Sequence, residues 1–546
     1  MRNMQRSMRE KFRLKRLTAL LLAICMLMGV GGAEEFENAL VEAQLMDGEA
    51  WGIQQSVGIN TDADLRVGYV AIQGARVNPF LCTDRDLVSL NQLVFESLVE
   101  LDDSFKPSPL LADSWTVDGK TWTFKLRHGV VFHNGASLTS ADVLMSYQSY
   151  LASGETNPYY GRLQLIESME ATDEFTVTVK SKVSGYVTLY AMTFPVVQYA
   201  TISDTLARGT GPYWYTEYVE NMGLRLEANP LWWKKDTNIH SIAALYYPES
   251  GDALEALHTR QIDLLCTQST TASFSRKMSD YTSMDYHTTT YEMIVPNLNE
   301  NSVMSDVRMR QAVMYAIDRA AIAENAYLGM GIQCEVPVNP GSWLYESQSA
   351  IYYYSPERAL QLLQSCGWSD VTGDGMLNQV EGVRLKDLTL RMVTYNEPTN
   401  SVRENAANMI VEYLRKVGIT VELEVRGKER TLRYINERDY DIALVGVNMS
   451  DVPDVTQLLG SGGDINLNNY GNKEMNELID KIPSAASEEE LKSLYSQIQM
   501  NVVERLPVLG ILFRTGTVLS TRSLSGLKGI RAGDTLNGIE FLQMEE

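Results

Sequence analysis

The chain between residues 107 and 147 contains Pro109-Leu110-Leu111-Ala112-Asp113-Ser114-Trp115, then Asp118-Gly119-Lys120-Thr121-Trp122-Thr123-Phe124-Lys125-Leu126-Arg127, then Gly129-Val130-Val131-Phe132-His133-Asn134-Gly135. Asp118-Gly119 is a tight-turn dipeptide. Residues 121–126 alternate polar and apolar side chains, which is the period of a strand with one buried face. Thr139-Ser140-Ala141-Asp142 then starts a helix that continues through Tyr150. The stretch therefore predicts a β-hairpin, a loop and a helix, in that order.

Length and composition indicate a globular protein of several structural units. The chain has 546 residues, of which 45% are hydrophobic. A chain of this length exceeds one ordinary core, so about two to four units are expected. Beyond the N-terminal region, the apolar runs stay shorter than the ~18 residues of a membrane-spanning helix.

The first 33 residues have the three-part layout of a secretory signal peptide. Seven basic residues precede the apolar run of residues 17–30, and Gly31-Gly32-Ala33 supplies the small residues that a signal peptidase needs. We therefore expect export to the periplasm or the outer face of the cytoplasmic membrane, with cleavage after Ala33. Two alternatives stay open: an uncleaved membrane anchor, and a lipid anchor at Cys25, against which the bulky Ile24 stands.

The net charge of the chain indicates which kinds of partner it can bind. The formal net charge is −22, and removal of residues 1–33, which carry seven basic residues and one acidic residue, lowers it to −28. Such an acidic surface repels phosphate backbones, so nucleic acid is not expected as a partner. The acidic residues 34–57 are expected to form a linker between the signal peptide and the folded body.

The cysteines beyond the signal region show no CxxC spacing. In an exported protein they could form disulfides, but no pairing follows from the sequence. Isolated buried thiols are the other interpretation. The residues concerned are Cys82, Cys266, Cys334 and Cys366.

The second half of the chain contains amphipathic helices. Apolar residues over 309–320 recur at the spacing of one helix face. Ser355-Pro356 starts a helix that Gly367 ends. Residues 401–417 form another helix, and Ser401 and Glu404 have the spacing of a capping box.

Strands are interleaved with these helices. Residues 419–425 alternate apolar and polar side chains, and residues 441–446 form an apolar run typical of a fully buried strand. A first strand is expected at 65–70, near the start of the folded body. The order of strands and helices predicts an α/β fold with a mixed or parallel sheet covered by helices.

One local motif suggests a metal ion. The residues at the loop positions of a calcium-binding EF-hand are Asp370, Thr372, Asp374, Met376, Asn378 and Glu381. A predicted strand replaces the helix that should follow, and aspartate and glycine are also common in turns. A structural calcium ion and a plain turn both stay open, and no other cofactor is expected.

Common catalytic motifs are missing from the sequence. It contains no GxSxG nucleophile elbow, no Walker A loop and no HExxH pair of zinc-binding histidines. His133 and the other histidines are scattered, so a structural role is favoured over metal binding. We therefore expect a protein that is not an enzyme.

In their order along the chain, these blocks resemble the family 5 extracytoplasmic solute-binding proteins, the receptors of peptide, nickel and related ABC importers. The 107–147 block is joined by Gly209-Thr210-Gly211-Pro212-Tyr213 and, as the most specific match, by Asp306-Val307-Arg308-Met309-Arg310-Gln311-Ala312 with Tyr315-Ala316-Ile317-Asp318-Arg319. The resemblance implies the two-lobed periplasmic-binding-protein fold of type II, an α/β fold with an extra subdomain and two crossing hinge segments. The implied bounds are lobe I at 58–298 with its subdomain at about 85–205, lobe II at 299–504, a return to lobe I at 505–546, and crossings near 296–299 and 506–513.

The resemblance also implies a function. Such a receptor captures its solute, here most simply a peptide, by lobe closure and delivers it to a membrane permease driven by a cytoplasmic ATPase. A monomer is expected. The alternatives are a sensory solute or peptide receptor on the same fold, and a binder of a non-peptide solute such as nickel, haem or an oligosaccharide.

Finally, the resemblance implies residues that face the ligand. In peptide-binding relatives an aspartate in the loop after the buried strand pairs with the ligand's α-ammonium group; Asp451 is the nearest candidate, and Ser450 takes its place if the alignment shifts by one residue. Dipeptide-binding relatives hold the ligand carboxylate with an arginine near the position of Glu397 in this chain, and Arg403 lies further on, so the resemblance puts dipeptide specificity in doubt. The further candidates are Ile72, Gln73, Gly74, Val447, Asn448, Trp343, Phe513 and Arg514.

Overall fold

The computed structural model describes residues 59–545 apart from 235, 398–399 and 451. The predicted signal peptide, the lipid anchor at Cys25, the 34–57 linker and the ligand-binding candidate Asp451 lie outside the described residues. Among the helices of the described part, none combines the length and hydrophobicity required to cross a membrane.

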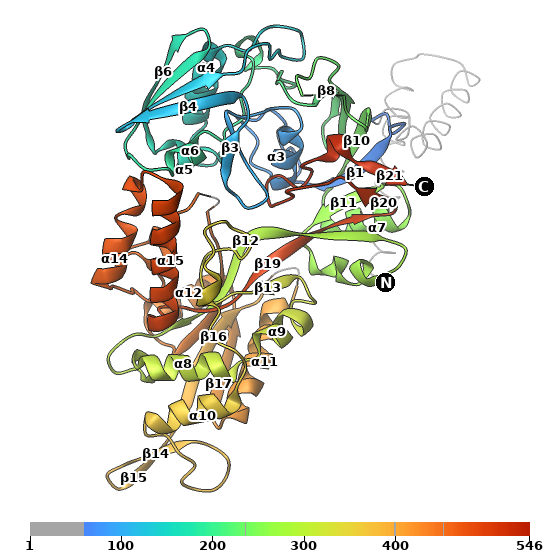
Figure 1. The fold of residues 1–546 in the computed structure, drawn as a ribbon. Helices are drawn as coiled ribbons and strands as arrows, with labels where there is room; N and C mark the ends of the chain where they lie inside the picture. The colour runs from blue at the N-terminus through green and yellow to red at the C-terminus, as the bar shows by residue number, and fades with distance from the viewer. Residues whose placement is uncertain (1–58, 235, 398–399, 451, 546) are drawn as a thin grey trace, which may run out of the picture. The chain divides into compact units, whose positions relative to one another are not determined.

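One mixed sheet runs through the described chain (Figure 1). Its strands lie in the order β17-β16-β18-β12-β19-β11-β1-β10-β9-β8, with β13 also beside β19. β1 is parallel to β10 and β11, β16 is parallel to β17 and β18, and the other pairs are antiparallel, so the expected mixed sheet is confirmed. The bounds are β1 Leu65–Val70, β8 Tyr213–Val219, β9 Gly223–Ala228, β10 Ser241–Tyr247, β11 Leu264–Thr267, β12 Thr282–Pro296, β13 Gly331–Gln333, β16 Thr389–Tyr395, β17 Thr420–Arg426, β18 Ile442–Asn448 and β19 Leu509–Ser520.

The long strands β12 and β19 join the two halves of this sheet. The first half contains β11, β1, β10, β9 and β8, and the second half contains β18, β16 and β17. Figure 1 shows β12 and β19 side by side between these halves. β12 pairs with β19 with a register shift between His287 and Tyr291, and its pairing with β18 begins at Thr290. From Tyr291 to Ile294, β12 is therefore paired with both β18 and β19, and the crossings expected near 296–299 and 506–513 stay a prediction. The lobe bounds given above stay a prediction.

The hairpin and helix expected from residues 107–147 are present. β4 (Ala112–Asp118) and β5 (Thr121–Leu126) meet at the Asp118-Gly119 turn. The apolar face of β5 is buried, and β6 (Ile166–Asp173) and β7 (Thr176–Ser181) extend the sheet to the order β4-β5-β7-β6. α4 (Ser140–Ser153) packs against β6 and β7.

The helix expected over 309–320 is interrupted. α8 (Val307–Ala316) ends where Ile317 becomes extended, and Asp318 starts α9 (Arg319–Asn325) by accepting a hydrogen bond from the Ala321 amide at 2.9 Å. An aspartate at this position satisfies an amide that the helix itself cannot bond. Two short helices therefore replace one long helix.

Two helices occur at the positions that the sequence predicts. α10 (Pro356–Ser365) follows the N-cap Ser355, whose side chain accepts a hydrogen bond from the Arg358 amide. α11 (Val402–Lys416) begins after Ser401, but Ser401 makes no side-chain capping bond, so the predicted capping box is wrong. The backbone of Ser401 lacks the extended conformation that aims a capping side chain at the first amides.

Further helices and short two-stranded sheets lie around these two sheets. α3 covers β1, and α7 lies beside β1, β10 and β11. The hairpin β14–β15 follows α10 and projects from the second half (Figure 1). The bounds are α3 Arg85–Gln92, β2 Val99–Leu101, β3 Pro107–Pro109, α7 Ser250–His258, β14 Asn378–Glu381, β15 Arg384–Asp387, α12 Lys428–Asn436, α14 Lys473–Ile479 and α15 Glu488–Arg505.

The cysteines are free thiols. Cys82, Cys266 and Cys334 are buried and Cys366 is partly buried, with no disulfide among the described residues. Burial raises the pKa of Cys266 to about 12. The interpretation as isolated thiols therefore fits the structure.

Candidate functional site

A small cavity lies where the two halves of the large sheet meet. Its volume is about 70 Å³. Part of its lining precedes β12 in the chain, part belongs to β12 and β19, and part follows from the second half. The lining residues are Phe105, Tyr190, Thr288, Thr289, Pro337, Val338, Asn339, Ser342, Leu344, Met449, Ser450, Val452, Pro453, Asp454, Val455, Tyr495 and Phe513.

One buried polar atom of this lining lacks a partner. The Asn339 amide donates to the Thr288 carbonyl at 2.9 Å, and the Tyr190 hydroxyl donates to the Phe105 carbonyl at 3.0 Å. By contrast, Tyr495 is 2% exposed, and its hydroxyl has no hydrogen-bond partner among the described residues. Leaving a buried hydroxyl unbonded is unfavourable. Tyr495 is thus the residue of this lining whose buried hydroxyl is unbonded among the described residues.

Trp343 joins the two halves beside this cavity without lining it. Its indole N–H donates to the Tyr190 hydroxyl at 3.0 Å, and its backbone amide donates to the Ser104 carbonyl at 2.9 Å. Its ring lies edge-on to Tyr186, with 5.9 Å between centroids. In this arrangement the indole N–H of Trp343 is already bonded within the protein.

Of the candidates around β18, Ser450 lines the cavity, whereas Val447 and Asn448 lie at the end of β18 outside its described lining. Asn448 Oδ1 accepts a hydrogen bond from the Thr290 hydroxyl at 2.9 Å, and Val447 is paired with Tyr291 across β12 and β18. Phe513, the candidate on β19, also lines the cavity. The structure thus brings part of the predicted set together.

The candidates after β1 lie elsewhere. Ile72 is 69% exposed, and its amide lies 3.4 Å from a carboxylate oxygen of Asp84. The Gly74 amide donates to Asn221 Oδ1 at 2.9 Å. Neither these two residues nor Gln73 is part of the described lining of the cavity.

Arg514 belongs to a buried network of four charges. Arg514 Nε donates to Glu292 at 2.7 Å, and its two terminal nitrogens donate to Glu397 at 2.6 and 3.1 Å. Arg403 donates to both oxygens of Glu292, at 2.8 and 3.0 Å, and lies 2.8 Å from Glu397. Two arginines therefore face two glutamates, which balances the charge.

This charge network determines what Arg514 can do. Burial would raise the pKa of Glu292, but Arg514 and Arg403 hold it below its ordinary value. Burial alone would lower the pKa of Arg514, but the carboxylate of Glu292 and its neighbours outweigh this effect, so the pKa of Arg514 lies above its ordinary value. Because Glu397 bonds both terminal nitrogens of Arg514, this guanidinium is not free to hold a ligand carboxylate. Glu397 thus neutralises Arg514 within the protein.

The predicted calcium loop is organised by its own hydrogen bonds. The carboxylate of Asp370 accepts hydrogen bonds from the amides of Gly373 at 2.7 Å, Asp374 at 3.2 Å and Gly375 at 2.9 Å. Within the described part of the chain, no group of three histidine, cysteine or acidic side chains is placed to hold a metal ion. This geometry fits a turn held by an aspartate, and bound calcium stays a prediction.

Sequence reasoning missed Tyr495, Tyr190 and Asn339. Tyr495 lies on the buried face of α15 with Leu491, Leu494 and Ile498, so its spacing is that of an ordinary core residue. Only the fold makes Tyr495 part of the cavity lining. No local pattern around it could have given that signal.

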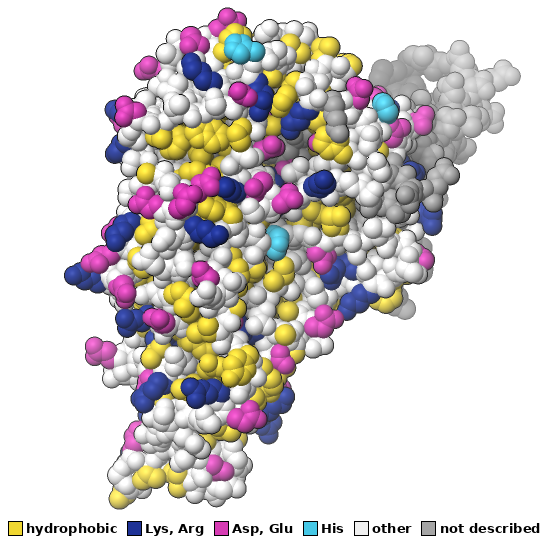
Figure 2. Space-filling view, viewed as in Figure 1, with side chains coloured by type: hydrophobic (Ala, Val, Ile, Leu, Met, Phe, Trp, Pro, Cys, Tyr) yellow, Lys and Arg dark blue, Asp and Glu magenta, His cyan; other side chains and the backbone are white. Residues whose placement is uncertain are grey.

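Figure 2 shows acidic and basic side chains interspersed over the visible face, without one large basic patch. That nucleic acid is not a partner stays a prediction from the net charge.

Comparison with known proteins identifies relatives over most of the chain. The family model of bacterial extracellular solute-binding proteins, family 5, matches residues 106–466. The oligopeptide-binding protein AppA of Bacillus subtilis is 23% identical over 489 residues, covering 85% of this chain and 89% of AppA. Heme-binding protein A of Haemophilus influenzae is 24% identical over 465 residues, covering 78% of this chain and 82% of that protein.

Solved structures share the fold. The nickel ABC transporter protein of Bacillus halodurans superimposes with a TM-score of 0.75 at 18% identity, covering 87% of this chain and 98% of that chain. The architecture is therefore the two-lobed α/β fold that the resemblance implied. Since the family model matches well over half of the chain, the protein belongs to the family 5 bacterial extracellular solute-binding proteins.

Proposed function

We propose that this solute-binding protein is the extracytoplasmic receptor of an ABC importer and that its solute is a peptide. The observation that carries the proposal is the cavity at β12 and β19, because residues from both halves line it, among them Tyr495, whose buried hydroxyl has no hydrogen-bond partner among the described residues. A peptide offers a carbonyl oxygen for such a hydroxyl at every residue. The similarity to an oligopeptide-binding protein over 85% of this chain supports the same solute.

Capture follows from the arrangement of the strands. β12 and β19 join the two halves, so bending at these strands changes the separation of the two walls of the cavity. A solute that contacts both walls favours the arrangement in which they are close. A permease that recognises this arrangement then accepts the solute. No chemical step is required, so the protein acts as a receptor and not as an enzyme, and it works as a monomer.

The proposal is tested by identifying what the protein carries. The protein is purified from its native host and examined by native mass spectrometry before and after denaturation. A released peptide supports the proposal and shows the lengths that are selected. A nickel complex, haem or an oligosaccharide would keep the solute receptor but remove the peptide. An empty protein that also ignores a peptide library would contradict peptide import and favour a sensory receptor for a narrower ligand.

A further inference from the structure

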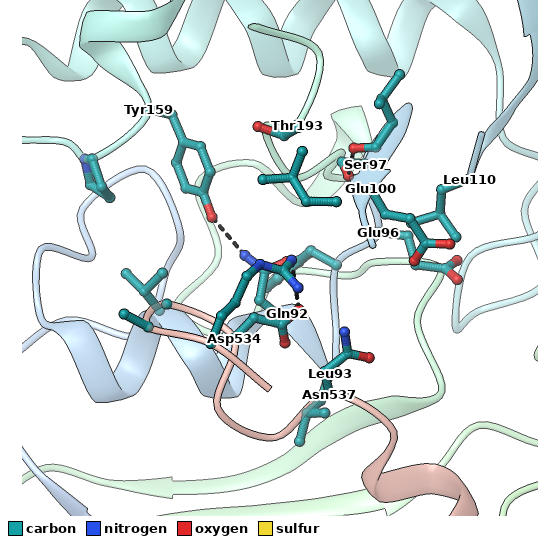
Figure 3. Close-up of a pocket in the computed structure, with 18 of the residues that line it drawn as sticks. Gln92, Leu93, Glu96, Ser97, Glu100, Leu110, Tyr159, Thr193, Asp534 and Asn537 are labelled. Atoms are coloured by element: carbon teal, nitrogen blue, oxygen red, sulfur yellow. Dashed lines mark hydrogen bonds and ion pairs between the residues drawn. The ribbon is translucent and has the colours of Figure 1, made fainter. Parts of the chain in front are cut away.

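The first half of the chain contains a second, larger cavity whose charges balance. Its volume is about 330 Å³, and it shares no described lining residue with the cavity at β12 and β19. Figure 3 shows Gln92, Tyr159 and Asp534 around this space. The charged residues of its described lining are Glu96, Glu100, Asp534 and Glu540 together with Arg85, Arg162, Lys234 and Arg531. Four carboxylates are thus matched by four basic side chains, and this lining carries no net charge.

Two backbone hydrogen bonds join the first half to the second outside the large sheet. The Gly185 amide donates to the Pro483 carbonyl at 2.9 Å, and the Tyr186 amide donates to the Ala485 carbonyl at 2.7 Å. The two donors precede α6 (Thr188–Ala191) in the first half, and the two acceptors precede α15 in the second half. Figure 1 shows α15 reaching the region of α6. These two bonds together are called the latch contact below.

Gly185 permits the close approach of the two segments. A Cβ atom at position 185 would lie 2.7 Å from the carbonyl oxygen of Pro483 and 3.0 Å from that of Ala485. Both distances are well below the ~3.5 Å at which carbon atoms pack without repulsion, and backbone oxygens cannot turn aside as the end of a flexible side chain can. Gly185 is not one of the glycines with positive φ, so the backbone conformation does not require glycine there. The latch contact itself therefore requires it.

Tyr186 adds two side-chain contacts to the second half. Its hydroxyl donates to Glu488 at 2.9 Å, and its ring lies edge-on to Trp343. Tyr186 is 8% exposed and Ala485 is 0% exposed. The two backbone bonds thus lie among largely buried side chains, where a hydrogen bond is stronger than in water.

The latch contact is continuous with the walls of the cavity at β12 and β19. Tyr190, on α6 just after Tyr186, lines this cavity from the first half. Tyr495, on the helix that begins at Glu488, lines it from the second half. Formation of the latch contact therefore brings two walls of this cavity toward each other.

We propose that the latch contact sets the balance between the closed and the open arrangement of the empty receptor, with Gly185 as the residue that permits closure. This inference rests on the closure that belongs to the proposed function, and not on which solute is captured. The apparent affinity of a solute falls with the population of the arrangement that binds it. By stabilising the closed arrangement, the latch contact raises the affinity for any solute that contacts both walls.

The test follows the two donor amides in the intact protein after its solute has been removed by denaturation and refolding. Hydrogen–deuterium exchange, resolved to single amides by mass spectrometry, should show Gly185 and Tyr186 protected in the wild type. Gly185→Ala should speed exchange of the Tyr186 amide about tenfold, because the added Cβ prevents both backbone bonds. Gly161→Ala, at a glycine with open space around its Cβ position, is the matched control and should leave this exchange unchanged. Small-angle X-ray scattering should show a larger radius of gyration for Gly185→Ala alone.

The outcomes separate the latch contact from general stability and from the proposed function. The amides of β7 should exchange equally in the wild type and in Gly185→Ala, and faster exchange there would overturn the proposal by showing general loosening. Fast exchange of both donor amides in the wild type, or an unchanged Tyr186 amide in Gly185→Ala, would overturn it as well. If Gly185→Ala fails to fold, Tyr186→Phe decides: loss of the hydroxyl bond to Glu488 should speed exchange of the same amide about threefold. Because no solute takes part, these results are independent of the mass spectrometry that tests the proposed function.

Discussion

Two sets of charged contacts hold the second half of the chain in place, and they differ in their access to water. The buried network of Glu292, Glu397, Arg403 and Arg514 ties the joining strands β12 and β19 to the second half, and the Glu292 side chain is 0% exposed. The α15 contacts, by which we mean those of Glu488 with Lys106 and Tyr186, tie the second half to the first. There the Lys106 and Glu488 side chains are 35% and 38% exposed.

This difference determines what each set can contribute. Buried charges must be fully paired, because removing one partner leaves another in a medium that solvates it poorly. Exposed pairs are solvated in either state and contribute little. The buried network is therefore suited to fixing the joining strands, whereas the α15 contacts can form and break as the two halves move.

The largest expected effect comes from Glu292→Gln. The substitution leaves Arg403 and Arg514 buried with only Glu397 as a charged partner, so the free energy of unfolding should fall by about 3–5 kcal/mol. Urea denaturation followed by circular dichroism measures it. Glu424→Gln, at the partly exposed pair with Arg391, is the control and should change it by less than about 1 kcal/mol. A loss for Glu292→Gln as small as that of the control would contradict the buried character of the network.

The same residue predicts an acid dependence. The pKa of Glu292 in the folded protein lies below its ordinary value of 4.5, because Arg514 and Arg403 outweigh the effect of burial. A lowered pKa stabilises the folded state above the ordinary value, and this stabilisation is lost as pH falls through the folded-state pKa. The difference in unfolding free energy between the wild type and Glu292→Gln should therefore be constant near neutral pH and shrink below about pH 4.5. A difference that grows toward acid would have the wrong sign.

Glu397→Gln should have an intermediate effect. Glu397 is 16% exposed, and Arg514 and Arg403 keep Glu292, so the free energy of unfolding should fall by about 1–2 kcal/mol. The released nitrogens of Arg514 would also become available to an anion. Titration with short peptides, each as a free acid and as a C-terminal amide, should show a gain in affinity for the free acids in the variant only. Equal gains for both forms would show that Arg514 does not reach the ligand.

The sequence predicted the local elements of the fold and little of the site. The turn at Asp118-Gly119 and the cap at Ser355 are chemical signals within a few residues, so the hairpin and α10 could be placed correctly. The break at Ile317 was missed because the apolar spacing continues through it. Glu292 and Arg403 are 111 residues apart, and no periodicity in either segment indicates that they meet.

Tyr495→Phe should change stability only slightly and ligand binding more. Removing a buried hydroxyl that has no described partner should raise the free energy of unfolding by at most about 1 kcal/mol. If a peptide bonds this hydroxyl, the variant should bind it about fivefold more weakly. Calorimetry with a peptide found in the native protein measures the change, and Tyr150→Phe, whose buried hydroxyl also lacks a described partner but which is not part of the cavity lining, is the control. An equal loss of peptide affinity in both variants would argue against a role of Tyr495 in the cavity at β12 and β19.

The smallest effect is expected at the α15 contacts. Glu488 accepts a hydrogen bond from the Tyr186 hydroxyl at 2.9 Å and pairs with Lys106 at 2.5 Å. Glu488→Gln should lower the free energy of unfolding by only about 0.5 kcal/mol, and 1 M salt should remove most of this difference because exposed charges are screened. The same salt should leave the Glu292→Gln difference nearly intact, since the Glu292 side chain is 0% exposed and buried charges are screened much less. If 1 M salt removed the stability difference of both variants, the distinction between the two sets of contacts would be wrong. If it removes only the difference of Glu488→Gln, the two sets differ because water reaches one and not the buried Glu292 of the other.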